Sequence, residues 1–360
     1  MLRRILPFAA LLALAAVGVW IAIRSGGEPP DVTVYTSVDD EIARELLARY
    51  GKETGIRVQV VTDTEATKTI GLVNRLREES APGKAPRCDV FWNNEPSWTV
   101  RLAAEGLFDA YDSPAARDIP AGFRDPDAMW ASNGARARIF IVHRGALGGK
   151  APDSYLDLAD PEFRDLGTLA RPFAGTTVTH LAALRLHLGA EPFAKWFRDA
   201  AANGTAFASG NGAVAREVGQ GHRAYGFTDT DDFWARKSAG DPVEAVFPDQ
   251  APGAPGTFVL PVTVSVVKGA PHPANARRLF DWLVSPEVEA ALSASPYASL
   301  PVRPGTKPGP AGFTTAAFRA AAVDWSAAKE HLDAVLDLAK EVVQGSAPSK
   351  PPEAPASKPR

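Results

Sequence analysis

The stretch Ala137-Arg138-Ile139-Phe140-Ile141-Val142 reads as a strand long enough to pass from one folded body to another. A second long strand is predicted over residues 257–267, after the Pro- and Gly-rich turn at 252–256. A complete set of strand and helix segments lies between these two strands. They therefore predict two lobes that the chain crosses twice, an arrangement that can close about a hinge.

Strand and helix patterns alternate on both sides of the first crossing. Before it, apolar strands separated by helical stripes give a βαβαβ run, which argues for a parallel sheet covered by helices. The predicted strands are 32–35, 56–61, 89–92, 205–208 and 224–227, and the predicted helices include 176–188, 192–202, 213–218, 275–283, 286–293 and 327–343. The fold class expected is α/β, with two lobes and two crossing strands at the hinge.

Domain boundaries follow from these patterns. Lobe 1 is expected over residues 31–134 and 262–304, and lobe 2 over 135–261, with the turn-like Ser132-Asn133-Gly134 before the first crossing. C-terminal helices are expected over 305–344. Residues 345–360 are rich in Pro, Ala, Ser and Lys and predict a flexible tail, because such a segment buries too little apolar surface to order itself.

The amino terminus predicts export from the cytoplasm. Arg3 and Arg4 precede an apolar run over residues 5–23, and a polar stretch begins at Arg24. The run approaches the length of a bilayer span, and no clean Ala-x-Ala site ends it, so residues 1–27 are either a cleaved signal peptide or a retained membrane anchor. We expect a periplasmic or extracytoplasmic location, with tethering through this segment left open.

Composition excludes several function classes. The chain has 39 Lys and Arg against 42 Asp and Glu, a net charge of −3, which does not provide the basic face that nucleic acid needs. The lone Cys88 cannot form an internal disulfide. Metalloprotease, Cys-x-x-Cys, nucleophile-elbow and Walker motifs are all missing from the sequence, so we predict no catalytic residues and no enzyme. A monomer is expected.

Acidic residues stand where predicted strands give way to helices. Asp39 follows the first strand, Glu95 follows the strand 89–92, and Asp229, Asp231 and Asp232 follow the strand 224–227. In open α/β sheets, ligands bind beyond the carboxyl ends of the strands, so these carboxylates are expected to meet in one cleft that favours a cation. Asp40 stands next to Asp39 at the same strand end. Each acid also has a plain alternative as a helix cap or a helix-end charge, above all Asp40 and Asp232, while for Asp39 the cap and the ligand are equally open.

Other polar residues at strand ends suit an anion. Two segments, 62–68 and 209–212, open predicted helices, where free backbone N–H groups attract negative charge. An anion alone, or an anion that accompanies a metal, fits such a place. The candidate solute contacts are Ser37, Thr64, Thr67, Lys68, Asn94, Asn211 and Asp229.

Several segments together resemble one known family. They are Val34-Tyr35-Thr36-Ser37-Val38-Asp39, Glu53-Thr54-Gly55-Ile56-Arg57-Val58, Asp89-Val90-Phe91-Trp92, Gly210-Asn211-Gly212-Ala213-Val214-Ala215 and Lys268-Gly269-Ala270-Pro271-His272-Pro273. In combination they look like the ferric-iron-binding periplasmic proteins of ABC importers, a branch of the type II periplasmic binding proteins. The resemblance implies a two-lobe fold that delivers a solute to a membrane permease and its ATPase.

The same resemblance implies a metal site and shows a departure from it. The family binds iron with a His after the first strand, a Glu after the Asp-Val-Phe strand and a Tyr pair after a later strand. Here Glu95 matches the Glu, Asp39 stands in the place of the His, and Asp231-Asp232 stand in the place of the Tyr pair. The implied metal ligands are therefore Asp39, Glu95, Asp231 and Asp232, without the strong tyrosinate bonding of the family.

Three functions remain open at this point. The first is capture of a metal ion, with iron as the expected solute rather than a catalytic cofactor. The second is binding of a small phosphorylated or other organic anion. The third is an exported enzyme or a membrane-anchored sensor built on the same fold.

Overall fold

A computed structural model gives the fold of residues 29–62, 68–147, 149 and 151–345. The predicted export segment 1–27, the candidate contacts Thr64 and Thr67, and the tail 346–360 lie outside the described residues. Within the described ranges, no helix has both the length and the apolar character needed to cross a membrane.

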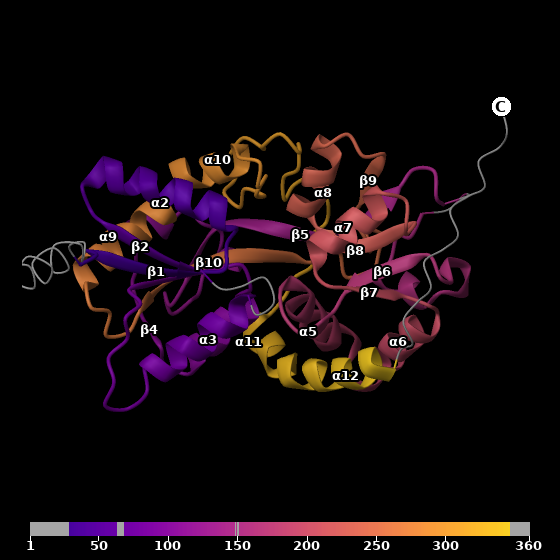
Figure 1. The fold of residues 1–360 in the computed structure, drawn as a ribbon, viewed down its shortest axis with the longest axis horizontal. Coiled ribbons are helices and arrows are strands. Elements are labelled where there is room, and N and C mark those ends of the chain that lie inside the picture. Colours follow the sequence, from indigo (N-terminus) through magenta and orange to yellow (C-terminus); the bar gives the residue numbers. More distant parts are fainter. Residues whose placement is uncertain (1–28, 63–67, 148, 150, 346–360) are drawn as a thin grey trace, which may run out of the picture.

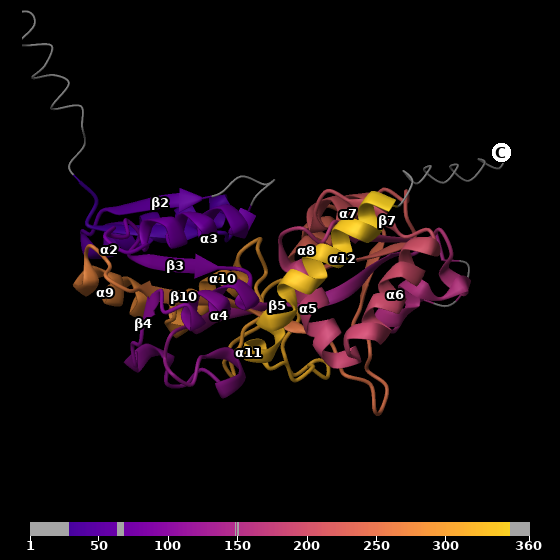
Figure 2. The ribbon, with the colours of Figure 1, turned by 90° about the horizontal axis from the view of Figure 1, so that it is seen from below.

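Ten strands of the described chain join into one continuous sheet with the order β2-β1-β3-β10-β5-β8-β6-β7, while β4 pairs with β10 and β9 pairs with β5. Figures 1 and 2 show that this sheet runs through two lobes. The strands are β1 Val32–Thr36, β2 Val58–Thr62, β3 Val90–Asn93, β4 Phe108–Asp109, β5 Ala131–His143, β6 Gly167–Ala170, β7 Ala206–Ala208, β8 Tyr225–Asp229, β9 Val243–Val246 and β10 Val259–Val267.

Helices cover both faces of the sheet in both lobes (Figure 1). Buried side chains of α2, α7, α8, α9 and α10 belong to one apolar layer, and those of α3, α4, α5, α6, α11 and α12 to the other. The bounds are α2 Asp40–Thr54, α3 Lys68–Glu79, α4 Pro96–Ala104, α5 Thr176–Leu188, α6 Ala190–Ala202, α7 Asn211–Gly219, α8 Thr230–Ser238, α9 Pro273–Leu283, α10 Pro286–Ala294, α11 Trp325–Ala328 and α12 Leu332–Gly345. Short 3-10 helices span Pro114–Ala116, Ala121–Phe123, Tyr155–Ala159, Pro161–Phe163 and Lys329–His331.

The first lobe begins with the βαβαβ run expected from the sequence. Strand β1 pairs in parallel with β2 and with β3, and its five residues are all buried because helices cover both faces. Helix α2 is preceded by its N-cap Asp39, whose side chain accepts from the Glu41 N–H, and is followed by Gly55 with φ 74°, a left-handed conformation that favours glycine.

Strand β5 carries the chain from one part of the sheet to the other. Its first half pairs with β10, as far as Ala137 opposite Val259, and its second half pairs with β8 from Arg138 opposite Asp229 onward. The second crossing strand is β10, which pairs with β3, β4 and β5. The structure has the two-lobe α/β fold with two crossing strands that the sequence predicted (Figure 1).

The expected turn at Ser132-Asn133-Gly134 is wrong, because these residues belong to β5. The Ser132 hydroxyl donates to the Gly134 carbonyl and accepts from the Gly134 N–H, which satisfies polar groups that would otherwise favour a turn. Gly134 has φ 149°, and a Cβ at this position would overlap the Ser299 hydroxyl. A glycine therefore lets the strand continue through a close contact.

The C-terminal helices bridge the two lobes. Helix α11 packs against α4 of the first lobe and α5 of the second, whereas α12 packs on α5 and α6 (Figure 2). Arg101 of α4 donates both terminal nitrogens to the Asp333 carboxylate of α12, at 2.8 and 2.9 Å. The last helix, whose packing the sequence did not assign, thus lies mainly on the second lobe.

Candidate functional site

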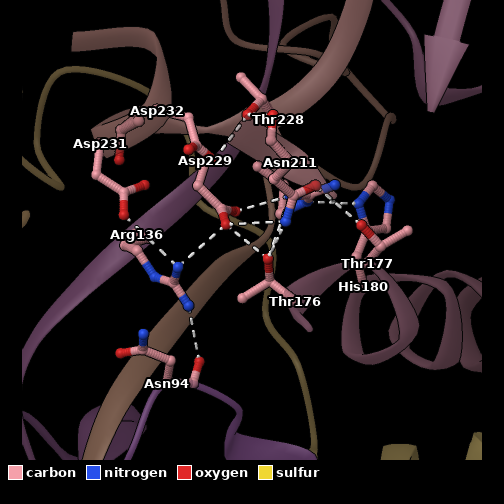
Figure 3. Close-up of polar contacts among 12 residues, drawn as sticks. Asn94, Arg136, Thr176, Thr177, His180, Asn211, Thr228, Asp229, Asp231 and Asp232 are labelled. Atoms are coloured by element: carbon pink, nitrogen blue, oxygen red, sulfur yellow. Dashed lines mark hydrogen bonds and ion pairs between the residues drawn. The ribbon is translucent and has the colours of Figure 1, made fainter. Parts of the chain in front are cut away.

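Three acids meet where β8 ends and α8 begins (Figure 3). Asp229 is the last residue of β8, and Asp231 and Asp232 lie in the first turn of α8. One carboxylate oxygen from each lies within 4.8 Å of the others, which makes them, within the described part of the chain, a group able to hold a metal ion. We call Asp229, Asp231 and Asp232 the acid group.

Asp229 is fully buried and already neutralised by protein donors. Its Oδ1 accepts from Arg138 Nη1 at 2.8 Å, and its Oδ2 accepts from Arg136 Nη1 at 3.1 Å and from the Thr176 hydroxyl at 2.6 Å. Although burial opposes ionisation, the charges of Arg138 and Arg136 hold the pKa of Asp229 below its ordinary value. Asp229 therefore acts as a structural anion in this arrangement, with its oxygens committed to protein donors.

Asp231 is different, because it retains an oxygen without a protein partner. Its side chain is 14% exposed, its Oδ2 lies 3.6 Å from Arg136 Nη1, and its buried Oδ1 has no hydrogen bond. Burial raises the pKa of Asp231 to about 7, and the nearby negative charges of Asp232 and Asp229 add to this, while Arg136 opposes it. A carboxylate in this state is ready to accept either a proton or another cation.

Asp232 and Asn211 complete this side of the site. The Thr228 hydroxyl donates to Asp232 Oδ2 at 2.9 Å, and the Asn211 amide donates to the Thr176 hydroxyl at 2.7 Å. Asn211 in turn accepts from the Thr177 hydroxyl at 3.0 Å, so its amide is held in one orientation. The start of α7 is thereby fixed next to the acid group (Figure 3).

Residues from the first lobe reach the same place through Arg136. Arg136 Nη2 donates to the Asn94 carbonyl at 3.0 Å, and the Tyr297 hydroxyl donates to Asn94 Oδ1 at 3.1 Å. Asn94 also donates from its side chain to the Ser37 carbonyl, and Ser37 donates to Asn93 Oδ1. Of the candidate solute contacts, Ser37 and Asn94 thus lie on the first-lobe side, and Asn211 and Asp229 lie on the second-lobe side.

Two of the acids proposed from the sequence lie outside the acid group. Asp39 is exposed and serves as the N-cap of α2, which was its plain alternative. Glu95 is 2% exposed and stands at the N-cap position of α4, where its side chain makes no capping hydrogen bond. Lys68 is the first residue of α3, and Thr64 and Thr67 fall outside the described residues.

Sequence reasoning missed the arginines and the tyrosine of this site. Arg136 and Arg138 are two residues apart on a strand, so they share one face, and both are buried. A charged pair in an apolar strand requires buried carboxylate partners, and this signal was present in the sequence. Arg138 also donates from Nε to His180 Nδ1 at 3.1 Å. Tyr297 had no comparable signal, because it follows α10 and lies 203 residues from its partner Asn94.

Polar groups from two lobes that meet at the crossing strands of a hinged α/β fold define a solute-binding protein. The family model described as bacterial extracellular solute-binding protein matches residues 88–331. Because this match covers more than half of the chain, the protein belongs to that family, whose description places its members outside the cytoplasm.

Individual proteins show the same likeness. Iron uptake protein A1 of Synechocystis is 26% identical over 281 residues, which cover 75% of this chain and 76% of the relative. The structure of apo ferric ion-binding protein A of Pasteurella haemolytica superposes with a TM-score of 0.76 at 24% identity and covers 89% of this chain and 99% of that one. AfuA of Actinobacillus pleuropneumoniae, with bound fructose-6-phosphate, has a TM-score of 0.75 at 18% identity, over 87% of this chain and 98% of that one.

Proposed function

We propose that this chain is the solute-binding component of an ABC importer and that its solute is iron. The observation that carries the proposal is the buried, unbonded Asp231 Oδ1 beside Asp232, where hard oxygen ligands face the junction of the lobes. The relative named an iron uptake protein supports the same solute. A membrane permease and its ATPase are the partners that this function requires.

Two of the proposed ligands already lie together, and two others would join them when the lobes close. Asp231 and Asp232 are the ligands already together in the structure. Asp39 and Glu95 lie at first-lobe strand ends, as expected for groups that approach a solute when the lobes close about β5 and β10. The first turn of α8, which follows β8, carries two acids, Asp231 and Asp232, and the hydroxyl of the nearby Tyr297 donates to Asn94. Carboxylate ligation is therefore proposed in place of tyrosinate ligation.

Binding measurements on the full chain test this proposal. Protein stripped of metal is titrated calorimetrically with Fe(III), Fe(II), Mn(II) and Ca(II), and with a panel of sugar phosphates and phosphonates. We expect saturable iron binding that Asp231→Asn weakens at least tenfold, because the neutral amide removes the charge and keeps the shape. Asp337→Asn, at an exposed acid of α12, is the matched control and should bind as the parent does.

A phosphorylated organic solute is the second candidate. Arg136 favours it, because a buried guanidinium at the junction of the lobes suits a phosphate or carboxylate. The fructose-6-phosphate bound to AfuA shows that this fold accommodates such a ligand. Saturation by organic anions alone, with no response to any metal, would reject iron in favour of this solute.

The proposal also covers the state of the protein at the membrane. We expect a monomer, tethered if residues 1–27 are retained and released if they are cleaved. Mass spectrometry of the exported protein distinguishes the two cases directly, and elemental analysis of the same sample identifies any metal that copurifies.

A further inference from the structure

Arg136 occupies a position that the proposed function does not by itself explain. It lies on the crossing strand β5, and its side chain is 8% exposed. One terminal nitrogen faces Asp229 and Asp231 of the second lobe, at 3.1 and 3.6 Å, and the other donates to the Asn94 carbonyl of the first lobe at 3.0 Å. A permanent positive charge thus lies beside Asp231, which we propose as a metal ligand.

Asp229 does not fully neutralise the charge of Arg136. That carboxylate also receives Arg138 Nη1 at 2.8 Å, so two guanidiniums share one fully buried anion. Thr176 and Asn211 add neutral donors to Asp229 Oδ2, the oxygen that also accepts from Arg136. One positive charge is therefore left to face Asp231, and Arg136 Nε, which is buried, has no hydrogen-bond partner.

We propose that Arg136 determines which sign of charge the site accepts. A bare cation bound by Asp231 would stand next to the guanidinium, whereas a solute that carries its own negative charge would be attracted to it. Two unit charges about 5 Å apart, at an effective dielectric constant of about 20, change a binding constant by a few hundredfold, to an order of magnitude. This inference rests on the proposed function and deepens it, since it assigns selectivity against bare divalent ions to a residue outside the predicted ligand set.

The surrounding contacts allow the charge to be removed without destroying the site. In Arg136→Gln, Asp229 keeps Arg138 and Thr176 as partners, whereas Asp231 loses the guanidinium that lies 3.6 Å from its Oδ2. The glutamine amide retains N–H donors of the kind that now bond the Asn94 carbonyl. Arg136→Met, which fills the volume without charge, is a second neutral variant, and Arg136→Lys keeps the charge as the matched control.

The experiment compares cation and anion affinities in these variants of the full chain. Calorimetric titrations use Ca²⁺ alone and Mn²⁺ alone in a non-coordinating buffer, and inorganic phosphate alone as the anion probe. We expect Arg136→Gln to bind both cations at least tenfold more tightly than the parent and phosphate at least tenfold more weakly. Arg136→Lys keeps the charge but not the two-ended contact, so its cation and phosphate affinities should lie closer to those of the parent than the affinities of either neutral variant.

Opposite changes for the two probes cannot come from a general loss of structure, which weakens both. Equal weakening of cation and anion binding in both neutral variants, or unchanged affinities in both, would overturn the role of Arg136. Failure of the proposed function looks different: the parent would then take up no iron, while phosphate would still separate the neutral variants from Arg136→Lys.

Discussion

Replacing Asp229 by asparagine should be among the most destabilising single changes in the chain. The carboxylate is fully buried and pairs with both Arg136 and Arg138, so Asp229→Asn leaves Arg138 without its carboxylate and Arg136 with only the longer contact to Asp231. Removing one partner of a buried ion pair costs about 3–5 kcal/mol, and two pairs are broken here, so we expect about 5 kcal/mol. Against a total stability of about 5–15 kcal/mol, this is a large fraction.

A second variant provides a comparison for the expected loss of stability. Arg138→Met leaves Asp229 with Arg136 and the Thr176 hydroxyl, so only one ion pair is lost and the cost should be near the lower limit, about 3 kcal/mol. The double variant should cost less than the sum of the two, by about 2 kcal/mol, because the groups interact directly. Asp337→Asn on the surface of α12 should change stability little.

Urea denaturation of the full chain, followed by both circular dichroism and tryptophan fluorescence, measures these free energies of unfolding. Coincident transitions for the two probes are required before a single value is assigned. A cost below about 1 kcal/mol for Asp229→Asn, or strictly additive costs in the double variant, would refute the view that this carboxylate is an ionic partner of both arginines.

Three further changes test other parts of the structure. Burial lowers the pKa of His180, so below about pH 6.5 this histidine is protonated in the unfolded chain but stays neutral in the folded chain. The free energy of unfolding therefore falls by up to about 1.4 kcal/mol for each pH unit below that value. The variant His180→Gln should flatten this part of the pH profile of the free energy of unfolding. Gly134→Ala should lower stability by about 1–3 kcal/mol because its Cβ meets the Ser299 hydroxyl at φ 149°, whereas Gly122→Ala, which has open space, should not, as thermal unfolding will show. Asp39→Ala should cost about 1 kcal/mol through loss of the α2 cap, measured by urea unfolding, and a weaker affinity for iron in the same variant would separate a ligand role from the cap.

The fold could be predicted from local patterns because most of its elements are long and periodic. Helix α5 lies where helical periodicity predicted it, at Thr176–Leu188, and the two crossing strands were identified from their apolar length. Of the strands with two to four residues, β3 and β7 were predicted and β4, β6 and β9 were missed, because so few residues do not display a period reliably. Their strand character comes from pairing with longer neighbours, which is a property of the assembled sheet.

The site could be predicted only in part, for a related physical reason. That acids follow β8 is visible in the sequence, and the structure brings Asp229, Asp231 and Asp232 together because they are neighbours along the chain. The partners of Asp229 are not neighbours: Arg138 lies 91 residues away and Thr176 lies 53 residues away. Asp229 was therefore counted among the solute contacts, although tertiary structure commits its oxygens to protein donors.

The position of the arginines follows from what β5 has to do at the junction of the lobes. The strand changes its partners between Ala137 and Arg138, where pairing with β10 ends and pairing with β8 begins. Arg136 and Arg138 flank this change on one face, and their shared anion is the last residue of β8. The energy of an apolar contact at this point would change little if one lobe shifted slightly against the other. The energy of a buried ion pair would change more, because it depends on distance and direction. Arg136, one of the two charges that hold the crossing strand to the second lobe, is thus also the charge that we propose to select what the adjoining carboxylates bind.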